Sequence, residues 1–525
     1  MVVAGICKPL LTIGLLCMLL LGSSSESRSV TQELPSARQA DKARVASASS
    51  QVHDGESPPG IPHLSEEEIK LLRALFGGIG PVILPPDSPE SDNAAEGASP
   101  HQHVTKREIA LDETSLFTPE QIHIAYGDGP TEMVIMWSTW SDGSSEVTYG
   151  LAPNNFTSRA EGNSEKFVDW YDEEFQAVPF IHRVKLQNLI PGATYSYKVK
   201  TEDVFSQPYT FNAMNAGTEW SPTLLVYGDM GSRGGAPSLK LLRRAARQKS
   251  VDAILHVGDF AYDLHDEGGK VGDDFMNRIQ SVAAELPYMT CVGNHEIPHD
   301  FAHYRYRFSM PGHSWPTRSR MWYSFDMGKV HFVAYSTEVY FIDNPYRAIE
   351  QMEWLEADLQ KANGERAQRP WIIAFGHRPM YCSNADRDDC TREDSRVRAG
   401  LEDIFYEQGV DLIIQAHEHS YERFWPMYRG SVTAKHYINP TAPVHVISGA
   451  AGCDEFHSVC VNPMFGPRGE WSAHRSWLPG LYGIGRLHIA NETHLHWQQR
   501  LAVNDQVQDE FWLEQNTHGP FQLRA

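Results

Sequence analysis

The chain has 525 residues, 41% of them hydrophobic and 21% charged, which is the composition of a globular protein too long for one ordinary domain. Its 45 basic and 67 acidic side chains give a formal charge of −22. This excess of negative charge argues against a general affinity for nucleic acid or acidic lipid, so we expect no nucleic-acid binding.

The first segment has the layout of a secretory signal peptide. Lys8 precedes an apolar run from Leu10 to Leu21, and small residues follow it. The run is short for a membrane span, so we predict a signal peptide at 1–24; a signal anchor is the alternative interpretation. No other run is long and apolar enough for a stable span. The protein is then expected to be secreted or lysosomal, through the secretory pathway.

Cysteine spacing fits an oxidising compartment. The pairs Cys382–Cys390 and Cys453–Cys460 are the simplest disulfides, although the spacing leaves the other connectivities open. Cys291, inside the apolar run YMTCV, would then be the free buried thiol.

Two sequons support the same compartment. Asn155 and Asn491 each begin an N-x-T triplet and are candidate N-glycosylation sites.

Residues 25–113 are rich in Ser, Ala, Glu and Pro, so we predict a largely disordered segment or pro-segment there. Short alternating runs then begin: QIHIAYG, EMVIMWST, SSEVTYG, HRVKLQNL, TYSYKVKT and PYTFNAM, separated by turn residues such as DGP and PGA. Strands of this length and spacing predict a small β-sandwich over 114–218, without a catalytic constellation of its own.

After Ser221 fully apolar runs alternate with helical patterns. Strands are predicted at TLLVY, AILHV, YMTCV, VHFVA, WIIAF, DLIIQ and PVHVIS, and helices at SLKLLRRAARQ, DDFMNRIQSVAAE, QMEWLEADLQKAN and RVRAGLEDIFYEQG. This alternation predicts an α/β layered domain over 219–519, with strands buried on both faces. Periodicity leaves open whether the strands form one sheet or two packed sheets.

Polar residues gather where these apolar runs end. They are Asp229, Asp259, Asn294, His295, His377, His417 and His419. Because ligands of open α/β folds bind at the carboxyl ends of strands, the segments are expected to converge on one site. A helix cap or satisfied polar group explains any single one of them, but not the set.

The residue types suggest the chemistry. Two carboxylates, an amide oxygen, three imidazoles and the phenol of Tyr262 are more ligands than one metal needs, and they would fill two sites that share Asp259. Paired metals bind a tetrahedral oxyanion and activate water for in-line displacement. Mixed oxygen and nitrogen ligands favour iron, manganese or zinc.

The blocks GDMG (228–231), GDFAY (258–262), GNHE (293–296), GH (376–377) and AHEHSYER (416–423) resemble the signature blocks of the metallophosphoesterases. With Tyr262 present they are similar to the purple acid phosphatases, and GHRPMYCS (376–383) is most similar to the animal long-form branch. The resemblance covers about residues 119–519. It implies a metallophosphoesterase β-sandwich flanked by helices and an N-terminal fibronectin-III-like domain.

The resemblance also implies residue roles. Asp229, Asp259, Tyr262 and His419 would bind Fe(III), and Asp259 would bridge to a divalent Zn, Fe or Mn ion held with Asn294, His377 and His417. A phenol with a pKa of about 10 becomes a ligand only beside a strong Lewis acid, which agrees with Fe(III). His295 would hold the phosphate or protonate the leaving group, or else lie behind the ligands.

Two departures from the family pattern stand out. Ala416 replaces a usual glycine, and its methyl is expected to be tolerated while shifting the tight turn. The loop after His377 contains no histidine, so Arg378, Asn384 or Arg387 would contact the substrate, or be solvated. Asp263 would repel polyanions or be solvated.

The expected function is a secreted dinuclear acid phosphatase that hydrolyses phosphate monoesters of small substrates by attack of a metal-activated hydroxide. A phosphodiesterase or nucleotide pyrophosphatase on the same site is one alternative. A catalytically silent binding or adhesion protein is another, and the complete ligand set argues against it. The oligomeric state and the natural substrate stay open.

Overall fold

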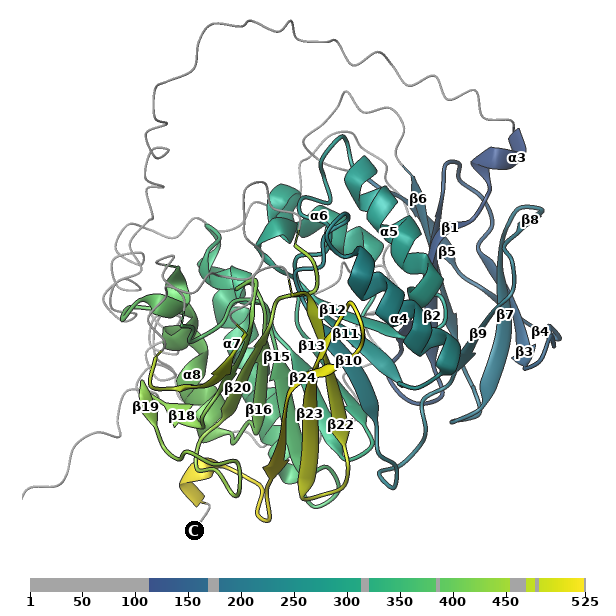
Figure 1. The fold of residues 1–525 in the computed structure, drawn as a ribbon. Coiled ribbons are helices and arrows are strands. Elements are labelled where there is room, and N and C mark those ends of the chain that lie inside the picture. The colour runs from purple at the N-terminus through teal and green to yellow at the C-terminus, as the bar shows by residue number, and fades with distance from the viewer. Residues whose placement is uncertain are drawn as a thin grey trace, which may run out of the picture. The chain divides into compact units, whose positions relative to one another are not determined.

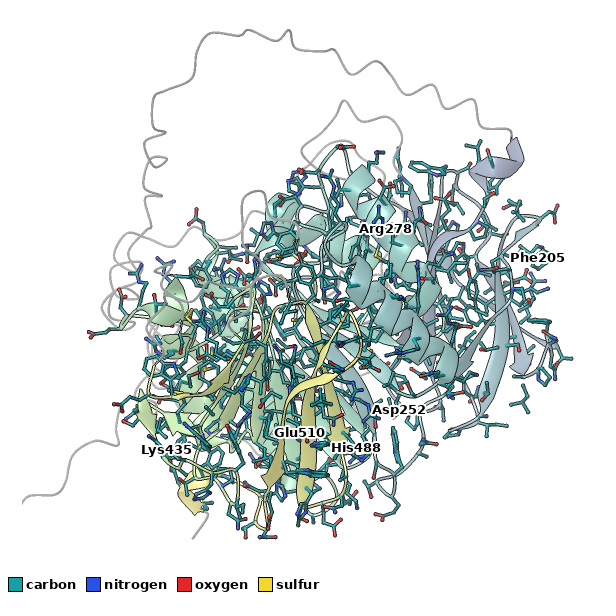
Figure 2. All side chains as sticks on the ribbon, viewed as in Figure 1. Phe205, Asp252, Arg278, Lys435, His488 and Glu510 are labelled. Carbon is teal, nitrogen blue, oxygen red and sulfur yellow. A yellow bond between two sulfur atoms is a disulfide. The ribbon has the colours of Figure 1, made fainter. Side chains whose placement is uncertain are left out.

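The structure of the chain is a computed structural model (Figure 1; Figure 2 shows its side chains). It describes residues 113–168, 179–312, 321–383, 388–453, 469–476 and 481–523. The predicted signal peptide, the segment that follows it up to residue 112, and Cys460 lie outside these residues, so the predictions for them stay predictions. Among the described residues, no helix combines the length and the apolar character needed to cross a bilayer.

The first folded part is a sandwich of two antiparallel sheets, preceded by the short helix α3 (Glu113–Leu116). One sheet has the order β1-β2-β6-β5 and contains β1 (Glu120–Tyr126), β2 (Met133–Thr139), β5 (Asn163–Lys166) and β6 (Phe180–Leu186). The other has the order β4-β3-β7-β8, with β9 on β7, and contains β3 (Glu146–Leu151), β4 (Ser158–Glu161), β7 (Thr194–Thr201), β8 (Val204–Phe205) and β9 (Tyr209–Asn212). The all-β N-terminal domain is therefore confirmed.

The sequence missed strands β4, β5 and β8 for a physical reason. Their side chains are exposed or half-buried throughout, so they lack the alternation of apolar and polar residues that predicts a strand. By contrast, β2 buries Met133, Ile135 and Trp137 in the core of the sandwich. The indole N–H of Trp137 donates to Thr201 Oγ1 at 2.8 Å, which satisfies its buried polar group.

The second part, the layered α/β domain, contains two larger sheets. The six-stranded sheet has the order β12-β11-β10-β22-β23-β24, with β10 (Thr223–Tyr227), β11 (Ala253–Val257), β12 (Tyr288–Cys291), β22 (Gly483–Ile489), β23 (His494–Leu501) and β24 (Val507–Glu514). The seven-stranded sheet has the order β13-β14-β15-β16-β20-β17-β21, with β13 (Tyr323–Met327), β14 (Val330–Ala334), β15 (Trp371–Phe375), β16 (Leu412–Gln415), β17 (Tyr421–Phe424), β20 (Val444–Ser448) and β21 (Ser472–Arg475). The hairpin β18 (Met427–Tyr428) and β19 (Ser431–Val432) completes the strands described.

Helices cover the two sheets. They are α4 (Ala236–Gln248), α5 (Lys270–Ala283), α6 (Pro298–Arg307), α7 (Pro345–Gly364) and α8 (Arg396–Glu407). In Figure 1, α4 and α5 lie beside β10 to β12, and α7 and α8 lie beside the seven-stranded sheet. The predicted layered α/β fold is confirmed, and the open question of sheet number is answered: in the described residues, the strands of this domain form two large sheets beside the β18–β19 hairpin.

Burial on both faces explains the continuous apolar runs. In β15, Ile373 and Phe375 belong to the core shared with the six-stranded sheet. The alternate residues Ile372 and Ala374 pack in a second core with side chains of α7 and α8, such as Leu355. Because neither face meets water, each position is apolar and the run gives no sign of which sheet it belongs to.

The two sheets approach each other closely at Gly228 and Ala416. The Gly228 N–H donates to the Ser448 carbonyl at 2.9 Å, and a Cβ on Gly228 would lie 2.5 Å from the Cβ of Ala416. The Ala416 methyl therefore fills space that Gly228 leaves open. Ala416 is fully buried and is not among the described residues with positive φ, so its methyl is tolerated, as expected from the sequence.

Strand β1 joins the sandwich to the α/β domain. It is an edge strand, and its N–H groups at Gln121 and Ile122 donate to Asn277 Oδ1 (3.2 Å) and Gln280 Oε1 (2.8 Å) of α5. The buried guanidinium of Arg307 donates to Gln121 Oε1 at 2.9 Å. Side chains of one domain thus satisfy the backbone of the other.

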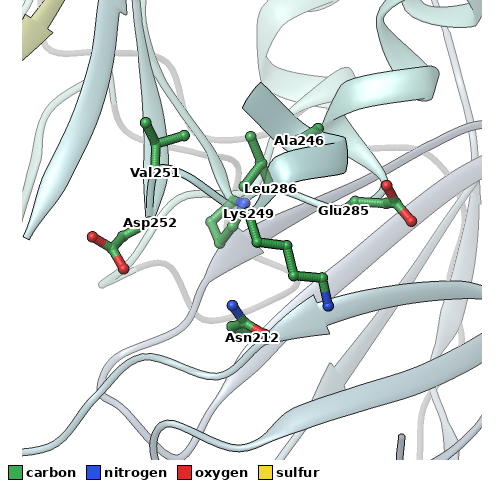
Figure 3. Close-up of a pocket in the computed structure, with 8 residues that line it drawn as sticks. Asn212, Ala246, Lys249, Val251, Asp252, Glu285 and Leu286 are labelled. Atoms are coloured by element: carbon green, nitrogen blue, oxygen red, sulfur yellow. The ribbon is translucent and has the colours of Figure 1, made fainter. Parts of the chain in front are cut away.

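A small pocket lies at the same junction (Figure 3). It is lined by Asn212 at the end of β9 and by Lys249, Asp252 and Glu285 from the α/β domain. None of these residues belongs to the polar set at the strand ends, so we assign this pocket no catalytic role.

Candidate metal centre

The predicted site residues follow strands: most lie in loops, and Asn294 and His295 lie in the short 3-10 helix η1 (Asn294–Glu296). Asp229 and Asp259 stand two residues after β10 and β11, and Asn294 follows β12 in the six-stranded sheet. His377 and His417 stand two residues after β15 and β16 in the seven-stranded sheet. Strands β10, β11 and β12 run parallel, as do β15 and β16, so their carboxyl ends meet at one edge of each sheet.

Several of these residues have left-handed backbone. Asp229 (φ 56°), Asp259 (φ 50°), Tyr262 (φ 54°) and His417 (φ 66°) all adopt a conformation that L side chains rarely occupy. Each such residue costs about 1–3 kcal/mol, and outliers of this kind concentrate at functional sites. These left-handed residues lie together at the strand ends, which indicates that the backbone is strained there to orient the side chains of the site.

Asp229, Tyr262 and His419 form the first cluster. The Tyr262 hydroxyl lies 2.8 Å from His419 Nε2 and 3.4 Å from Asp229 Oδ1, and His419 Nε2 lies 3.3 Å from the same Asp229 oxygen. The other Asp229 oxygen accepts the His417 N–H at 2.9 Å, which connects this cluster to the next. A carboxylate, a phenol and an imidazole thus point at one another.

Asp259, Asn294, His377 and His417 form the second cluster. His377 Nε2 lies 3.2 Å from Asp259 Oδ2, 3.1 Å from Asn294 Oδ1 and 3.2 Å from His417 Nδ1. His377 Nδ1 lies 2.8 Å from the Val257 carbonyl, to which it donates its hydrogen. In the neutral ring, Nε2 is then a lone-pair atom that faces other lone pairs.

This arrangement fits a cation. Converging lone pairs repel one another unless a positive charge lies between them, and a carboxylate, an amide oxygen and two imidazoles are ligands of borderline divalent metals. Among the described residues, Asp259, His377 and His417 offer ligand atoms that lie close enough together to hold one metal ion. A histidine whose remote N–H is bound to a backbone carbonyl is the usual form of a metal ligand.

The pKa values of the second cluster reflect the charges of its members. Burial disfavours the imidazolium of His377, but the Asp259 carboxylate outweighs it and raises the pKa of His377 to about 10. Burial likewise works against the Asp259 anion, yet the surrounding histidines, His377 first, bring the Asp259 pKa well below its usual range. Asp259 therefore stays an anion, and its charge is balanced either by the proton on His377 or by a cation that takes the place of that proton.

Glu296, which sequence reasoning left without a role, holds the Asp259 loop. Its carboxylate accepts the N–H groups of Asp259 (2.9 Å), Phe260 (3.2 Å) and Gly293 (2.8 Å). Burial, followed by the nearby Asp259 charge, raises the Glu296 pKa to about 7. Gly293 permits this approach, since a Cβ there would lie 2.1 Å from Asp259 Oδ1.

His295 lies beside both clusters and pairs with Asp263. Its Nδ1 is 3.1 Å from Asp263 Oδ1, its Nε2 is 3.9 Å from Asp259 Oδ2, and its ring meets Tyr262 edge-on at 4.7 Å. The bond to His295 is the main cause that lowers the Asp263 pKa. Asp263 is thus a hydrogen-bond partner of His295. The sequence alone predicts instead that Asp263 repels polyanions or is solvated.

The structure describes only part of the loop after His377. The Arg378 side chain is 13% exposed and its Nε lies 3.0 Å from buried Glu338, so Arg378 is not simply solvated, and its contact with a substrate stays a prediction. Asn384 and Arg387 lie outside the described residues. A disulfide joins Cys382 and Cys390, Cys453 is also disulfide-bonded, and Cys291 is free and buried.

The end of the last block, Tyr421 to Arg423, anchors neighbouring segments. The Tyr421 hydroxyl (2.7 Å) and Arg423 Nε (2.8 Å) both donate to Asp509 of β24. Glu422 accepts the Ser383 N–H at 3.0 Å and so holds the disulfide loop. The C-terminal strand and this loop are therefore fixed directly to the segment that carries His417 and His419.

Comparison with known proteins agrees with this geometry. Residues 119–213 match the purple acid phosphatase N-terminal domain, residues 222–421 the calcineurin-like phosphoesterases, and residues 442–510 the iron/zinc purple acid phosphatase-like protein C domain. The chain is 47% identical over 410 residues to acid phosphatase type 7 of Homo sapiens, covering 75% of this chain and 90% of that protein. Identity to acid phosphatase type 7 of Danio rerio is 44% over 425 residues, covering 77% and 92%.

Among solved structures, the purple acid phosphatase PPD1 from yellow lupin (Lupinus luteus) seeds has a similar fold. The TM-score is 0.65 at 23% identity, and the match covers 76% of this chain and 75% of the lupin chain. At this identity the likeness concerns the fold.

Proposed function

This chain belongs to the purple acid phosphatase family, and on that premise we propose that it is a secreted phosphatase that hydrolyses phosphate monoesters at a centre of one ferric ion and one divalent ion. The observation that carries the proposal is the convergence of Asp229, Tyr262 and His419 beside Asp259, Asn294, His377 and His417.

Each cluster would hold one metal. Asp229, Tyr262 and His419 would bind the ferric ion, because a phenolate requires a strong Lewis acid. Asn294, His377 and His417 would bind zinc, iron or manganese, and Asp259 would serve both positions. When bound, the two cations activate water and neutralise the charge that develops on the phosphate.

His295 is the proposed acid of the reaction. Asp263 binds its Nδ1 and so directs Nε2 toward the clusters, where it can hold a phosphate oxygen or give a proton to the leaving alkoxide. The proton must be on His295 before the bond breaks, so low pH favours this step. That requirement supports an acidic optimum.

The compartment rests on the signal peptide pattern and on accessible sequons. Asn155 and Asn491 are both exposed, as glycosylation requires. Enzymatic removal of N-glycans from the protein secreted by animal cells should lower its mass, and Asn155→Gln with Asn491→Gln should abolish the shift. Failure of the chain to reach the medium or the lysosome would contradict the proposed route.

One experiment tests the centre and the substrate class together. The protein is purified, its metals are counted by elemental analysis, its visible spectrum is recorded, and phosphate monoesters and diesters are assayed from pH 4 to 8. We expect two metals per chain, a broad visible band, and monoester hydrolysis fastest at acidic pH.

Tyr262→Phe is the decisive variant, with Tyr346→Phe, an exposed tyrosine, as its control. The visible band should vanish in the first and persist in the second, because it arises from the phenolate of Tyr262. A colourless parent that contains only zinc would contradict the ferric assignment. Faster hydrolysis of diesters would change the substrate class, and two bound metals without hydrolysis would make the chain a silent relative.

A further inference from the structure

His417 presents its two ring nitrogens to different partners. Nδ1 lies 3.2 Å from His377 Nε2 and faces the second cluster, while Nε2 lies 2.5 Å from Asp388 Oδ2. A carboxylate on the remote nitrogen of a metal-binding histidine fixes the tautomer and orientation of the ring and strengthens it as a ligand. Asp388 stands 29 residues from His417 in the sequence, and no pattern connects them.

Arg378 competes for the same nitrogen, and the tautomer decides between the two. Its Nη1 lies 3.0 Å from His417 Nε2 and 3.6 Å from Asp388 Oδ2. When Nδ1 gives its lone pair to a metal, Nε2 carries the hydrogen and can only donate. The guanidinium cannot accept it, so Asp388 is the partner of the ring and Arg378 is the cation beside that carboxylate, itself paired with buried Glu338.

The backbone around Asp388 is anchored on both sides. Cys390, two residues later, is joined to Cys382, and Ser383 is held by Glu422. Asp389 accepts from the Ser395 hydroxyl at 2.6 Å and from the Arg396 N–H at 2.9 Å, which fixes it to the start of α8. These links place Asp388 without relying on its own side chain.

We propose that Asp388, held by the Cys382–Cys390 loop, is a positioning residue that orients His417 for the second metal. The inference rests on the proposed two-metal function. It gives the disulfide a role beyond the stability of the loop: the covalent link keeps the carboxylate against the histidine. The effect falls on the second metal, since Asp388 contacts the ring of His417, whereas His419 of the first cluster, on the same segment, directs its Nε2 to Tyr262 and Asp229.

The test is the affinity of the second position for Zn²⁺ in the full chain. The parent and Asp388→Asn are partly depleted so that one metal remains, and Zn²⁺ is added against a competing chelator. Asp388→Asn should bind Zn²⁺ about 10–100-fold more weakly, because a neutral amide supports the ring less well. The first metal should be retained in both proteins. Asp394→Asn, an exposed carboxylate paired with Arg392 nearby, is the control and should bind as the parent does.

A second variant separates positioning from folding. The double change Cys382→Ser with Cys390→Ser keeps Asp388 but frees the loop, and it should weaken the second position while leaving the first metal bound. An affinity of Asp388→Asn within twofold of the parent would overturn the inference. So would equal loss of both metals together with a lower melting temperature, or a third metal present in the parent and absent from Asp388→Asn, which would make Asp388 a ligand with His417 and Glu418.

Metal binding by the parent protein distinguishes a failure of the proposed function from a failure of this inference. A parent that binds no metal would overturn the proposed function, and this inference with it. A parent that binds two metals, with an unchanged second position in Asp388→Asn, would overturn the inference alone.

Discussion

The two sheets of the catalytic domain bring different atoms to the metal centre. The six-stranded sheet supplies the oxygen side chains Asp229, Asp259, Tyr262 and Asn294. The seven-stranded sheet supplies the imidazoles His377, His417 and His419. Neither sheet alone offers a complete ligand set.

The difference shows that the centre depends on how the sheets pack. The six-stranded side carries the carboxylates, and the seven-stranded side carries imidazoles that protein groups hold in place, as the Val257 carbonyl holds His377 Nδ1. A metal bound between them would bind the packed domain and not the unfolded chain. Metal occupancy is therefore expected to stabilise the packing of the two sheets.

Removing the shared carboxylate should have the largest effect. Asp259→Ala takes charge from the oxygen side of both clusters and is expected to lower kcat/KM by about a thousand-fold or more, with loss of both metals. Activity and metal content are measured beside Asp274→Ala, an exposed carboxylate on α5. Activity near that of the parent would refute the site itself.

Removing one imidazole should affect one side only. His377→Ala deletes the donor at the middle of the second cluster, and we expect a loss of more than about 100-fold in second-metal affinity, with the first metal kept. Elemental analysis after dialysis checks the ratio. Loss of both metals in equal measure would show that the two sheets do not act separately.

Asp263 lies on the oxygen side but outside both clusters. Asp263→Asn should leave two metals bound and lower kcat by about tenfold, since it weakens the orientation and protonation of His295. The loss should be larger for alkyl phosphates than for nitrophenyl phosphate, whose leaving group needs no proton. Equal losses for both substrates would remove His295 from the role of acid.

His331, in β14 of the seven-stranded sheet, is a histidine that contributes to the stability of the fold. It lies between Asp326 (2.7 Å) and Asp358 (2.9 Å). Burial works against its charge, but these carboxylates raise its pKa to about 9. Because the folded pKa exceeds the unfolded value of about 6.5, the stabilisation is complete below pH 6.5 and is lost as the pH rises through 9.

The smallest effect is therefore expected from His331→Gln. It should lower the free energy of unfolding by about 2 kcal/mol near pH 6 and by little above pH 9, without loss of metal. Urea unfolding at several pH values measures it. A deficit that is the same at pH 6 and pH 10 would contradict the ion-pair explanation.

The convergence of the strand-end side chains could be predicted because the rule behind it is geometric. Ligand-binding residues of α/β folds gather at the carboxyl ends of strands, so the sequence predicts one shared site for Asp229, Asp259 and His377. The two-sheet arrangement could not be predicted, since Ile372 and Ile373 face different cores yet look alike in the sequence. Helix α6 was missed because His299, in its first turn, has positive φ and interrupts the helical period.

No local sequence pattern predicts the residues that support the site. Glu296 accepts hydrogen bonds from three backbone N–H groups, and the direction of backbone N–H groups cannot be predicted from residue types. Asp263 follows Tyr262 and precedes Asp266 and Glu267 by a few residues, and this sequence would look the same if all three acidic side chains were solvated. Asp388 reaches His417 only because the disulfide loop and β16 are neighbours in space.

The contact between β1 and α5 has a consequence for handling the protein. Asn277 and Gln280 occupy the N–H groups of Gln121 and Ile122, so this strand is closed to pairing with a strand of another molecule. A sandwich expressed without α5 would lose that protection. Such a fragment should self-associate through the bared strand, whereas the whole chain shields it from aggregation and domain swapping.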